Sequence, residues 1–593
     1  MTPPAARPVN LHPVTHPKGP AVTTARLRRR AAVAVLLCLS VVAAACSSSD
    51  PTAAGGGGTT AAPTTFQEQH KGGDLKLLAK TAAGTLDPQV NYTLQYWQLY
   101  QAMYDGLTAF KKVDGQDSFT VVPDLAEALP TVSADGKSYT FTLRKGIKFA
   151  NGKDVTVADV AASYKRIFTV SSPTAGTFYN GIIGAAACLT DPTTCDLSKG
   201  VVVDPAANTI VINLVAPDPE LSYKLSVPHA SILPADSPPK DAGNVPIPGT
   251  GPYMAASYDP NTALSLVRNP SFIEWSHDAQ PQGYSDTISE TFGLTVEAEI
   301  TAVENGQADW VFDPPPADRL DEIGTKYADQ AHVNPLTAMY YLAMNTNLAP
   351  FNDVRVRQAI NYAVDRQAAS TLYGGSNLAQ PVCTFLPPGF PGHVDDCQYT
   401  AGGGSTWSAP DLDKAKALIA ASGTAGMDVG IVTQDDEVNK SIGEYLQSLL
   451  TTLGYKATLK PISANIQFTY IQNTNNNVQI SLTSWYQDYP AASDFLNVLE
   501  SCASFTPGSD SSINIAGFCD KDIDAKMQQA LVTGQTDRTG ADAQWAEIDK
   551  AVMAKAPVAP LFTPKLVDFT STRVGNYQFS KQFYMLVSQL WTT

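Results

Sequence analysis

Residues 409–485 alternate between two hydrophobic periods, and this alternation constrains the fold more than any other feature of the chain. Segments whose apolar residues recur at helical spacing, each followed by a glycine, alternate with segments whose apolar residues have strand-like spacing. The predicted elements are helix 411–422, strand 429–434, helix 440–453, strand 455–460 and strand 478–482. Such alternation predicts βαβ units and a parallel sheet. Ligands bind beyond the carboxyl ends of parallel strands, so the segment after Leu482 is favourably placed for a site.

Further elements are predicted outside this stretch. Residues 139–143 alternate at period two and are expected to form a half-buried strand. Thr156 and Asp159 resemble a capping box, with Asp in place of the usual Glu or Gln, and are expected to start a helix. Two more predicted elements are a strand at 341–344 and a single helix at 354–369.

Residues 1–45 have the order of a secretory signal peptide. A basic cluster at 26–30 precedes an apolar run at 31–42 and then small residues up to Cys46. The apolar run is shorter than the ~20 residues that a membrane-spanning helix needs, so we expect a processed signal. The first 25 residues are unusually long and Pro-rich for the start of a signal, and we therefore expect translation to begin at Val22.

Small residues immediately before Cys46 resemble the bacterial lipobox. In that motif the cysteine thiol is acylated, which would anchor the chain to the outer face of the cytoplasmic membrane. The alternative is an ordinary signal cleaved near Ala45, because Ala43 stands where the motif usually has Leu. Residues 46–70 are expected to form a flexible tether, since Ser, Gly, Thr, Ala and Pro dominate them up to about residue 65.

The chain contains eight cysteines, of which Cys38 lies in the signal and Cys46 is assigned to lipid. The other six fall into three local pairs in loop-like sequence: Cys188 with Cys195, Cys383 with Cys397, and Cys502 with Cys519. Six cysteines allow fifteen connectivities, and proximity favours these three disulfides, as expected in an oxidising compartment. The spacings lack the C-x₂-C form of zinc sites, so no metal and no cofactor is expected.

Composition and motifs argue against two classes of function. The formal net charge of −16 opposes nucleic-acid binding, because phosphates require a basic surface. The chain has no G-x-S-x-G elbow, no H-E-x-x-H pair and no Walker A loop, and its histidines are scattered singly. We therefore expect a protein that is not an enzyme, with a secreted hydrolase as the competing class.

Several segments, in order, resemble the peptide/nickel/opine-type extracellular solute-binding proteins. They are the segments 124–127, 135–149, 151–152, 158–160, 249–253, 268–270 and 345–366, which include Gly249-Thr250-Gly251-Pro252-Tyr253 and Pro350-Phe351-Asn352-Asp353-Val354-Arg355. The resemblance runs from about residue 73 to the end of the chain.

This resemblance implies a bilobed α/β fold like that of periplasmic binding proteins, with two lobes joined by two chain crossings and a ligand cleft between them. Lobe one would hold 71–333 and 559–593, with a subdomain at about 110–245, and lobe two would hold 334–558. The implied function is to bind oligopeptides, as a monomer, and to deliver them to the membrane permease subunits of an ABC-type importer. The alternative is the same fold with another solute, an oligosaccharide or a metal chelate.

The resemblance also points to a ligand site after residue 482. Peptide-binding members have an Asp in a W-x-x-D-Y-type segment that accepts a charge-assisted bond from the ligand α-ammonium group, and Trp485 and Asp488 match it by position. The alternative for Asp488 is a turn residue before Pro490. Trp485 is expected either to pack on a ligand side chain or to form part of the wall of the lobe. Tyr489 is expected to form part of the wall.

Two departures from the family pattern concern the other end of the ligand. The arginines that bind a ligand carboxylate in dipeptide and oligopeptide binders fall at Asn439 and Leu482, so neither clamp is present. Tyr92 replaces an acidic contact of lobe one, and Tyr96 and Trp97 are expected to make the cleft entrance aromatic. Such a cleft suits longer peptides, or an oligosaccharide stacked on the rings.

Overall fold

Three main sheets organise the chain in the computed structural model, which describes residues 66–510 and 512–593. The predicted signal peptide, the predicted lipidation site Cys46 and most of the predicted tether lie outside the described residues. No helix of the described part combines the length and the apolar character that crossing a membrane requires.

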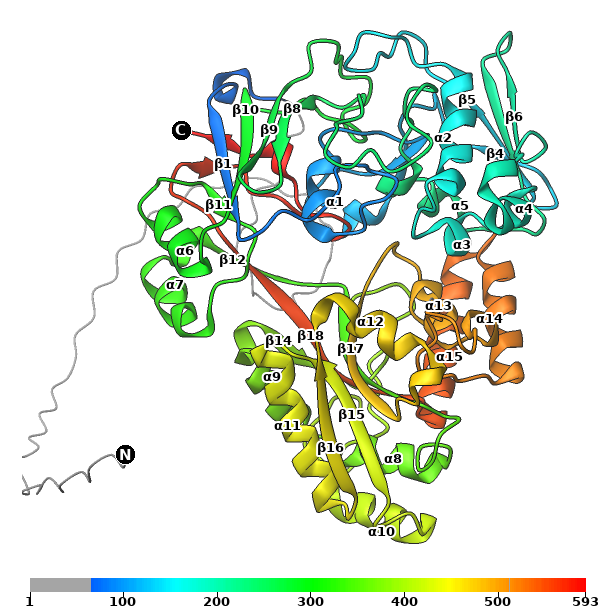
Figure 1. Ribbon diagram of the computed structural model, residues 1–593, viewed down its shortest axis with the longest axis vertical. Helices are drawn as coiled ribbons and strands as arrows, with labels where there is room; N and C mark the ends of the chain where they lie inside the picture. The colour runs from blue at the N-terminus through cyan, green and yellow to red at the C-terminus, as the bar shows by residue number, and fades with distance from the viewer. Residues whose placement is uncertain (1–65, 511) are drawn as a thin grey trace, which may run out of the picture. The chain divides into compact units, whose positions relative to one another are not determined.

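The first sheet has five strands in the order β11-β1-β10-β9-β8 (Figure 1). Their bounds are β1 Asp74–Ala79, β8 Tyr253–Asp259, β9 Ala263–Arg268, β10 Thr287–Phe292 and β11 Trp310–Val311. β1 runs parallel to β10 and β11, and β8, β9 and β10 form an antiparallel meander. Leu75 and Leu77 of β1 are fully buried in the largest hydrophobic core, which also contains α1 (Leu94–Tyr100).

The second sheet is antiparallel and has four strands, β4 Thr131–Val132, β5 Ser138–Thr142, β7 Thr209–Asn213 and β6 Val201–Asp204. β5 confirms the strand predicted at 139–143, with Tyr139 and Phe141 buried. Helix α2 (Val157–Thr169) follows, and both bonds of the capping box between Thr156 and Asp159 are present. The prediction of a helix start at this box is confirmed.

The third sheet follows the order β12-β18-β13-β17-β15-β16, and β14 pairs with β18. The bounds are β12 Ala331–Pro335, β13 Ala338–Met344, β14 Ala379–Pro381, β15 Asp428–Gln434, β16 Lys456–Ile462, β17 Ile480–Tyr486 and β18 Val558–Phe569. β15 is parallel to β16 and to β17, as predicted for residues 429–482. The sheet as a whole is mixed, because β13 lies antiparallel to both of its neighbours, β17 and β18.

Helices flank this third sheet. α10 (Leu412–Ser422) and α11 (Glu437–Thr452) match the two predicted helices, and Asp411 and Asp436 cap them. The single helix predicted at 354–369 is wrong. The chain leaves the helix at Val364, and Asp365 then caps a second helix by accepting a bond from the Ala368 N–H, which gives α8 (Val354–Ala363) and α9 (Arg366–Tyr373). A further helix, α12 (Ala464–Gln472), connects β16 to β17 and was not predicted.

The chain passes between the first and third sheets twice. It enters the third sheet through β12 and returns along β18, whose continuation at Thr570 bridges to Trp310 of β11. Figure 1 shows β12 and β18 running side by side between the two sheets. The two crossings agree with a bilobed binding-protein fold, and the lobe boundaries given above stay a prediction.

The three cysteine pairs form disulfides as predicted. Cys188 bonds to Cys195, Cys383 to Cys397 and Cys502 to Cys519. Each bond closes a loop of 7 to 17 residues between neighbouring elements.

Candidate functional site

Asp488 lies just beyond the carboxyl end of β17, where the sequence placed a ligand site. β17 ends at Tyr486, and the N–H of Asp488 donates to the Asp494 carboxylate (2.9 Å). The Asp488 carbonyl accepts a bond from the Gln582 side chain (2.8 Å). These two backbone bonds fix a carboxyl group whose residue is only 6% exposed.

The Asp488 carboxylate has one side-chain donor, Tyr92. The Tyr92 hydroxyl donates to Asp488 Oδ1 at 2.5 Å, across 396 residues of sequence and between the two predicted lobes. Tyr92 lies just before α1, and 43% of its surface is exposed. Its ring packs against Trp97 (5.4 Å between centroids) and His229 (5.1 Å). Tyr92 therefore presents an open aromatic face beside a buried carboxylate.

The electrostatics around Asp488 favour the binding of a cation. Burial raises the pKa of Asp488 to about 7, although the Tyr92 bond opposes the shift. Burial, and next the charge of Asp488, hold the pKa of Asp494 well above its usual range. Within the described residues, neither carboxyl group forms an ion pair with Lys, Arg or His. A ligand ammonium group at Asp488 would supply the missing counter-charge.

Trp485 and Tyr489 lie on either side of Asp488 in the sequence, and each packs against different residues. Trp485 is half-buried near Phe468, and a hydrogen bond from its side chain opposes the rise in the pKa of Asp494. Tyr489 is 2% exposed and packs on Phe178 (5.5 Å) and Tyr223 (6.4 Å). Tyr489 therefore lies where a wall residue would lie, while Trp485 keeps both roles that the sequence left open.

The predicted aromatic entrance divides into exposed and buried parts. Trp97 is 8% exposed and donates its indole N–H to the Asn91 carbonyl (3.0 Å). Tyr96 is fully buried, and its hydroxyl lies 2.9 Å from that of Tyr258. Tyr96 belongs to α1 and lies in the largest hydrophobic core, whereas Tyr92 precedes the helix and remains exposed. The structure thus removes Tyr96 from the set of plausible ligand contacts.

The two positions where the family arginines are missing hold side chains that are engaged elsewhere. The Asn439 amide donates to the capping carboxylate of Asp436 (2.7 Å). Leu482 is 1% exposed inside the third sheet. Neither position offers a cation to a ligand carboxylate.

Sequence reasoning missed two acidic residues beside Asp488. Asp494 lies in the short helix η9 (Ala492–Asp494), and its closeness to Asp488 in the segment was the only signal available. Glu220 comes from the other predicted lobe, and the Ser493 hydroxyl donates to its Oε1 (2.5 Å). No sequence signal connects residues 273 positions apart. No group of three or more His, Cys, Asp or Glu side chains in the described chain is arranged to hold a metal ion.

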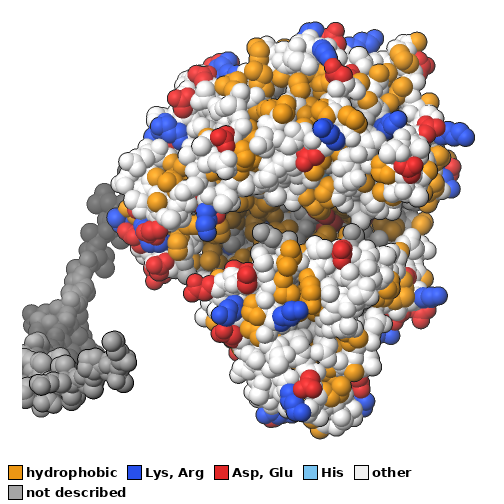
Figure 2. All heavy atoms as spheres, viewed as in Figure 1, with side chains coloured by type: hydrophobic (Ala, Val, Ile, Leu, Met, Phe, Trp, Pro, Cys, Tyr) orange, Lys and Arg blue, Asp and Glu red, His pale blue; other side chains and the backbone are white. Residues whose placement is uncertain are grey.

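Figure 2 shows one face of the described residues, hollowed above α12 and the upper ends of β15 and β16, with hydrophobic side chains along the hollow. The arrangement around Asp488 is suited to binding. It offers a buried anion, an exposed phenol ring and backbone groups.

Comparison with known proteins gives a consistent picture. The family described as bacterial extracellular solute-binding proteins, family 5, matches residues 120–507. The periplasmic oligopeptide-binding protein OppA of Escherichia coli (strain K12) is 24% identical over 519 residues, covering 83% of this chain and 87% of OppA. The probable deoxycholate-binding periplasmic protein YgiS of the same organism is 25% identical over 536 residues, covering 85% of this chain and 91% of YgiS.

Among solved structures, the fold resembles that of clavulanic acid biosynthesis oligopeptide binding protein 2. The TM-score is 0.79 at 23% identity, with 88% of this chain and 96% of the other chain covered. This likeness shows the same fold over most of the chain.

Proposed function

The chain belongs to the bacterial extracellular solute-binding proteins of family 5, and on this premise we propose that it captures oligopeptides outside the cytoplasm and delivers them to the permease subunits of an ABC-type importer. The observation that carries the proposal is the Asp488 carboxylate, which is buried beyond the end of β17 and, within residues 66–510 and 512–593, has the Tyr92 phenol as its one side-chain donor. Similarity to OppA over 83% of the chain supports peptides as the ligand class.

In this proposal the ligand α-ammonium group bonds to Asp488. A charge-assisted bond between ammonium and carboxylate is about twice as strong as a neutral bond, and burial at Asp488 strengthens it further. The same burial penalises Asp488 when no cation is present, which makes the site selective for a free N-terminus. Tyr92 then offers its ring face to the first ligand side chain, and Trp97 supports that ring.

The protein acts by binding, with no chemical step. Peptides suit this chemistry because backbone groups and ordered water can satisfy the ligand main chain while accepting varied side chains. We propose further that Cys46 carries a lipid and that residues 46–70 tether the monomeric body to the outer face of the membrane. Mass spectrometry of the exported protein tests the anchor, since acylation adds lipid mass to a peptide beginning at Cys46.

A second candidate is the same fold with a ligand other than a peptide. The observation that favours it is the similarity to YgiS, whose name gives deoxycholate as its probable ligand. A steroid carboxylate carries no ammonium group and would place a second anion near Asp488 and Asp494. The carboxylates around the site therefore favour peptides over this ligand.

The test is calorimetric titration of peptides that are identical except for N-terminal acetylation. We expect acetylation to weaken binding at least about tenfold, because it removes the charge that Asp488 accepts. Asp488→Asn should weaken free peptides to the level of acetylated ones. Glu444→Gln, an exposed charge change on α11, should change neither affinity. Equal affinity for both peptides in the wild type would contradict the role of Asp488.

A further inference from the structure

Three tyrosines continue the edge of the third sheet away from Asp488. Tyr486 is the last residue of β17, two positions before Asp488, and 37% of its surface is exposed. Tyr340 lies on β13, and Tyr373 is the last residue of α9; both are half-buried. None of the three has a role in the site described above.

Strand register places these phenols together. β13 pairs with β17 so that Tyr340 lies opposite Ser484 and Ala338 lies opposite Tyr486. Tyr340 and Tyr486 are therefore diagonal neighbours on one face of the sheet, a distance that aromatic side chains span. The rings of Tyr340 and Tyr373 lie 5.0 Å apart, and both pack on the fully buried Phe562, at 5.0 and 4.8 Å.

A fourth phenol connects this cluster to Asp488. Tyr584 belongs to the hairpin of β20 (Phe579–Ser580) and β21 (Tyr584–Met585), and it packs in one hydrophobic cluster with Ala338, the residue opposite Tyr486. Burial raises the pKa of Tyr584, and the charge of Asp488 raises it further. A line of phenols therefore runs from Asp488 along the sheet edge to Tyr373.

The far end of this line is neutral to acidic. β15 is parallel to β17, so the N-terminus of α11 lies at the same edge of the sheet. Asp435, Asp436 and Glu437 occupy this N-terminus. Burial raises the pKa of Tyr373, and the charge of Asp436 raises it further. One nearby cation is Lys565 on β18, whose ammonium group donates to the Ser376 carbonyl (2.7 Å) in the loop after Tyr373. A ligand carboxylate placed here would face acidic side chains, and the adjacent Lys565 is engaged by a backbone carbonyl.

We propose that Tyr486, Tyr340 and Tyr373 bind an uncharged stretch of the ligand, so that the protein selects peptides by their free N-terminus and does not require a free C-terminal carboxylate. This inference rests on the proposed function, since it takes Asp488 as the place of the ammonium group. Phenol hydroxyls donate to and accept from peptide groups, and their rings pack on side chains of any type. The ligand class is therefore peptides whose C-terminal carboxylate does not meet this surface. Such peptides either extend beyond the three tyrosines or are amidated at the C-terminus.

One peptide in four forms tests the inference separately from the proposed function. A pentapeptide of uncharged side chains is prepared with a free or acetylated N-terminus and with a C-terminal acid or amide, and each form is titrated calorimetrically into the full exported protein. We expect amidation to change the dissociation constant by less than about threefold, or to lower it, while acetylation weakens binding about tenfold or more. A free acid that binds about tenfold more tightly than its amide would overturn the inference and leave the role of Asp488 standing. Loss of the acetylation effect would overturn the proposed function instead.

Variants of the phenols test the same surface without altering its shape. Tyr486→Phe and Tyr373→Phe remove only a hydroxyl, and each is expected to weaken the amidated pentapeptide about three- to tenfold. Tyr362→Phe is the matched control, because its hydroxyl accepts from Lys414 on another part of the lobe. Equal affinity of the two phenol variants and the control would overturn the inference, and so would a selective loss of free-acid binding in Lys565→Ala. Thermal unfolding of each variant verifies that it folds.

Discussion

At the residue scale, Asp488 combines a function with an energetic cost. The fold buries the Asp488 carboxyl group with no basic partner among the described residues, and the group resists ionisation for that reason. Burial, and next the charge of Asp488, also raise the pKa of its neighbour Asp494. Sites that bind ligands commonly retain such destabilising groups, because ligand binding relieves the cost.

The first prediction concerns stability and pH. The folded pKa of about 7 lies above the unfolded value of about 3.9, so the folded state holds the extra proton between these values. Stability therefore falls as pH rises from about 4 to 7, and the loss is complete above pH 7. Asp488→Asn, which keeps an acceptor for Tyr92, is expected to raise the free energy of unfolding by about 1–3 kcal/mol at about pH 8, and by little at about pH 4.

Urea unfolding of the ligand-free protein at both pH values measures this effect. Glu444→Gln serves as the control for the change in net charge, since this side chain is exposed. An Asp488→Asn variant that is less stable than the wild type at about pH 8 would show that the carboxylate has a cationic partner in the free protein.

The second prediction concerns affinity and pH. Only the ionised carboxylate attracts an ammonium group, and a pKa of about 7 leaves about a tenth of Asp488 ionised at pH 6 and half at pH 7. Free N-terminal peptides are therefore expected to bind about fivefold more tightly at pH 7 than at pH 6, as measured by calorimetry. The dependence should vanish in Asp488→Asn, and its persistence there would assign it to another group.

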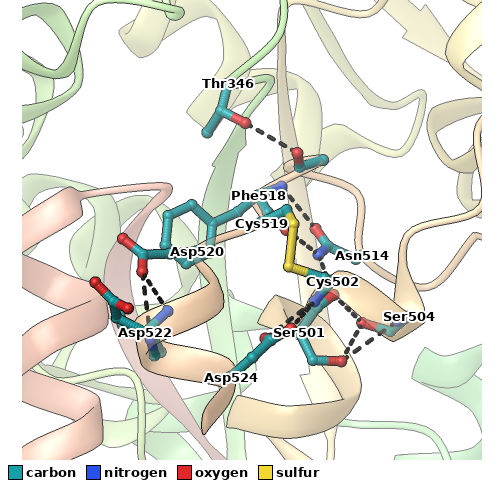
Figure 3. Close-up of a disulfide and its surroundings, with 12 residues drawn as sticks. Thr346, Ser501, Cys502, Ser504, Asn514, Phe518, Cys519, Asp520, Asp522 and Asp524 are labelled. Atoms are coloured by element: carbon teal, nitrogen blue, oxygen red, sulfur yellow. Dashed lines mark hydrogen bonds between the residues drawn. A yellow bond between two sulfur atoms is a disulfide. The ribbon is translucent and has the colours of Figure 1, made fainter. Parts of the chain in front are cut away.

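At the element scale, the segment that carries Asp488 is held at both ends. β17 fixes its start, and α13 (Leu496–Glu500) leads into the disulfide between Cys502 and Cys519, after which α14 (Lys521–Thr533) begins. Figure 3 shows this disulfide between the turn at Ser501 and the N-terminus of α14, where Asp524 accepts from the Cys502 N–H (3.1 Å). Thr346, just after β13, donates to the carbonyls of residues 516 and 517 and ties the loop to the third sheet.

The third prediction follows from this loop. Replacing both Cys502 and Cys519 by Ala is expected to lower the free energy of unfolding by about 3 kcal/mol, because the bond closes 17 residues. The shorter loop between Cys188 and Cys195 is the matched control, and its loss should cost less because it closes 7 residues. Urea unfolding measures both. A larger loss from the shorter loop would contradict the loop-length argument.

Elements with strong local patterns could be predicted from sequence, and others could not. Helical spacing followed by a glycine identified α10 and α11, and the capping box at Thr156 identified α2. α12 lacks a comparable pattern, and the break at Val364 depends on Asp365 capping a new helix where apolar spacing continues. The position of Asp488 after β17 was predictable from the parallel strands, whereas its bond to Tyr92 depends on the two lobes meeting.

At the scale of the whole molecule, the two predicted lobes touch around the site. Tyr489 packs on Phe178, Ser493 donates to Glu220, and the Arg538 guanidinium lies 4.9 Å from the centre of the Tyr223 ring. Arg538 also donates to the Pro490 carbonyl (3.1 Å). These contacts lie beside Asp488 and form when the cleft is narrow, so they favour a closed arrangement.

The fourth prediction uses these contacts. Arg538→Ala is expected to weaken peptide binding about three- to tenfold and to enlarge the radius of gyration of the ligand-free protein in X-ray scattering, because it removes closed-state contacts and touches no proposed ligand atom. Lys550→Ala, on the same helix α15 (Arg538–Lys555) and paired with Glu547 of that helix, is the control. A variant that loses affinity with unchanged scattering would place Arg538 in direct contact with the ligand instead.

The central claim is that Asp488 receives the ligand ammonium group, and a crystal structure of the protein with a bound peptide tests it most directly. We predict that the peptide N-terminal nitrogen lies about 3 Å from an Asp488 carboxylate oxygen, in a charge-assisted bond. A peptide whose N-terminus lies elsewhere in the cleft, with the bond from Tyr92 as the only side-chain contact of Asp488, would contradict the account.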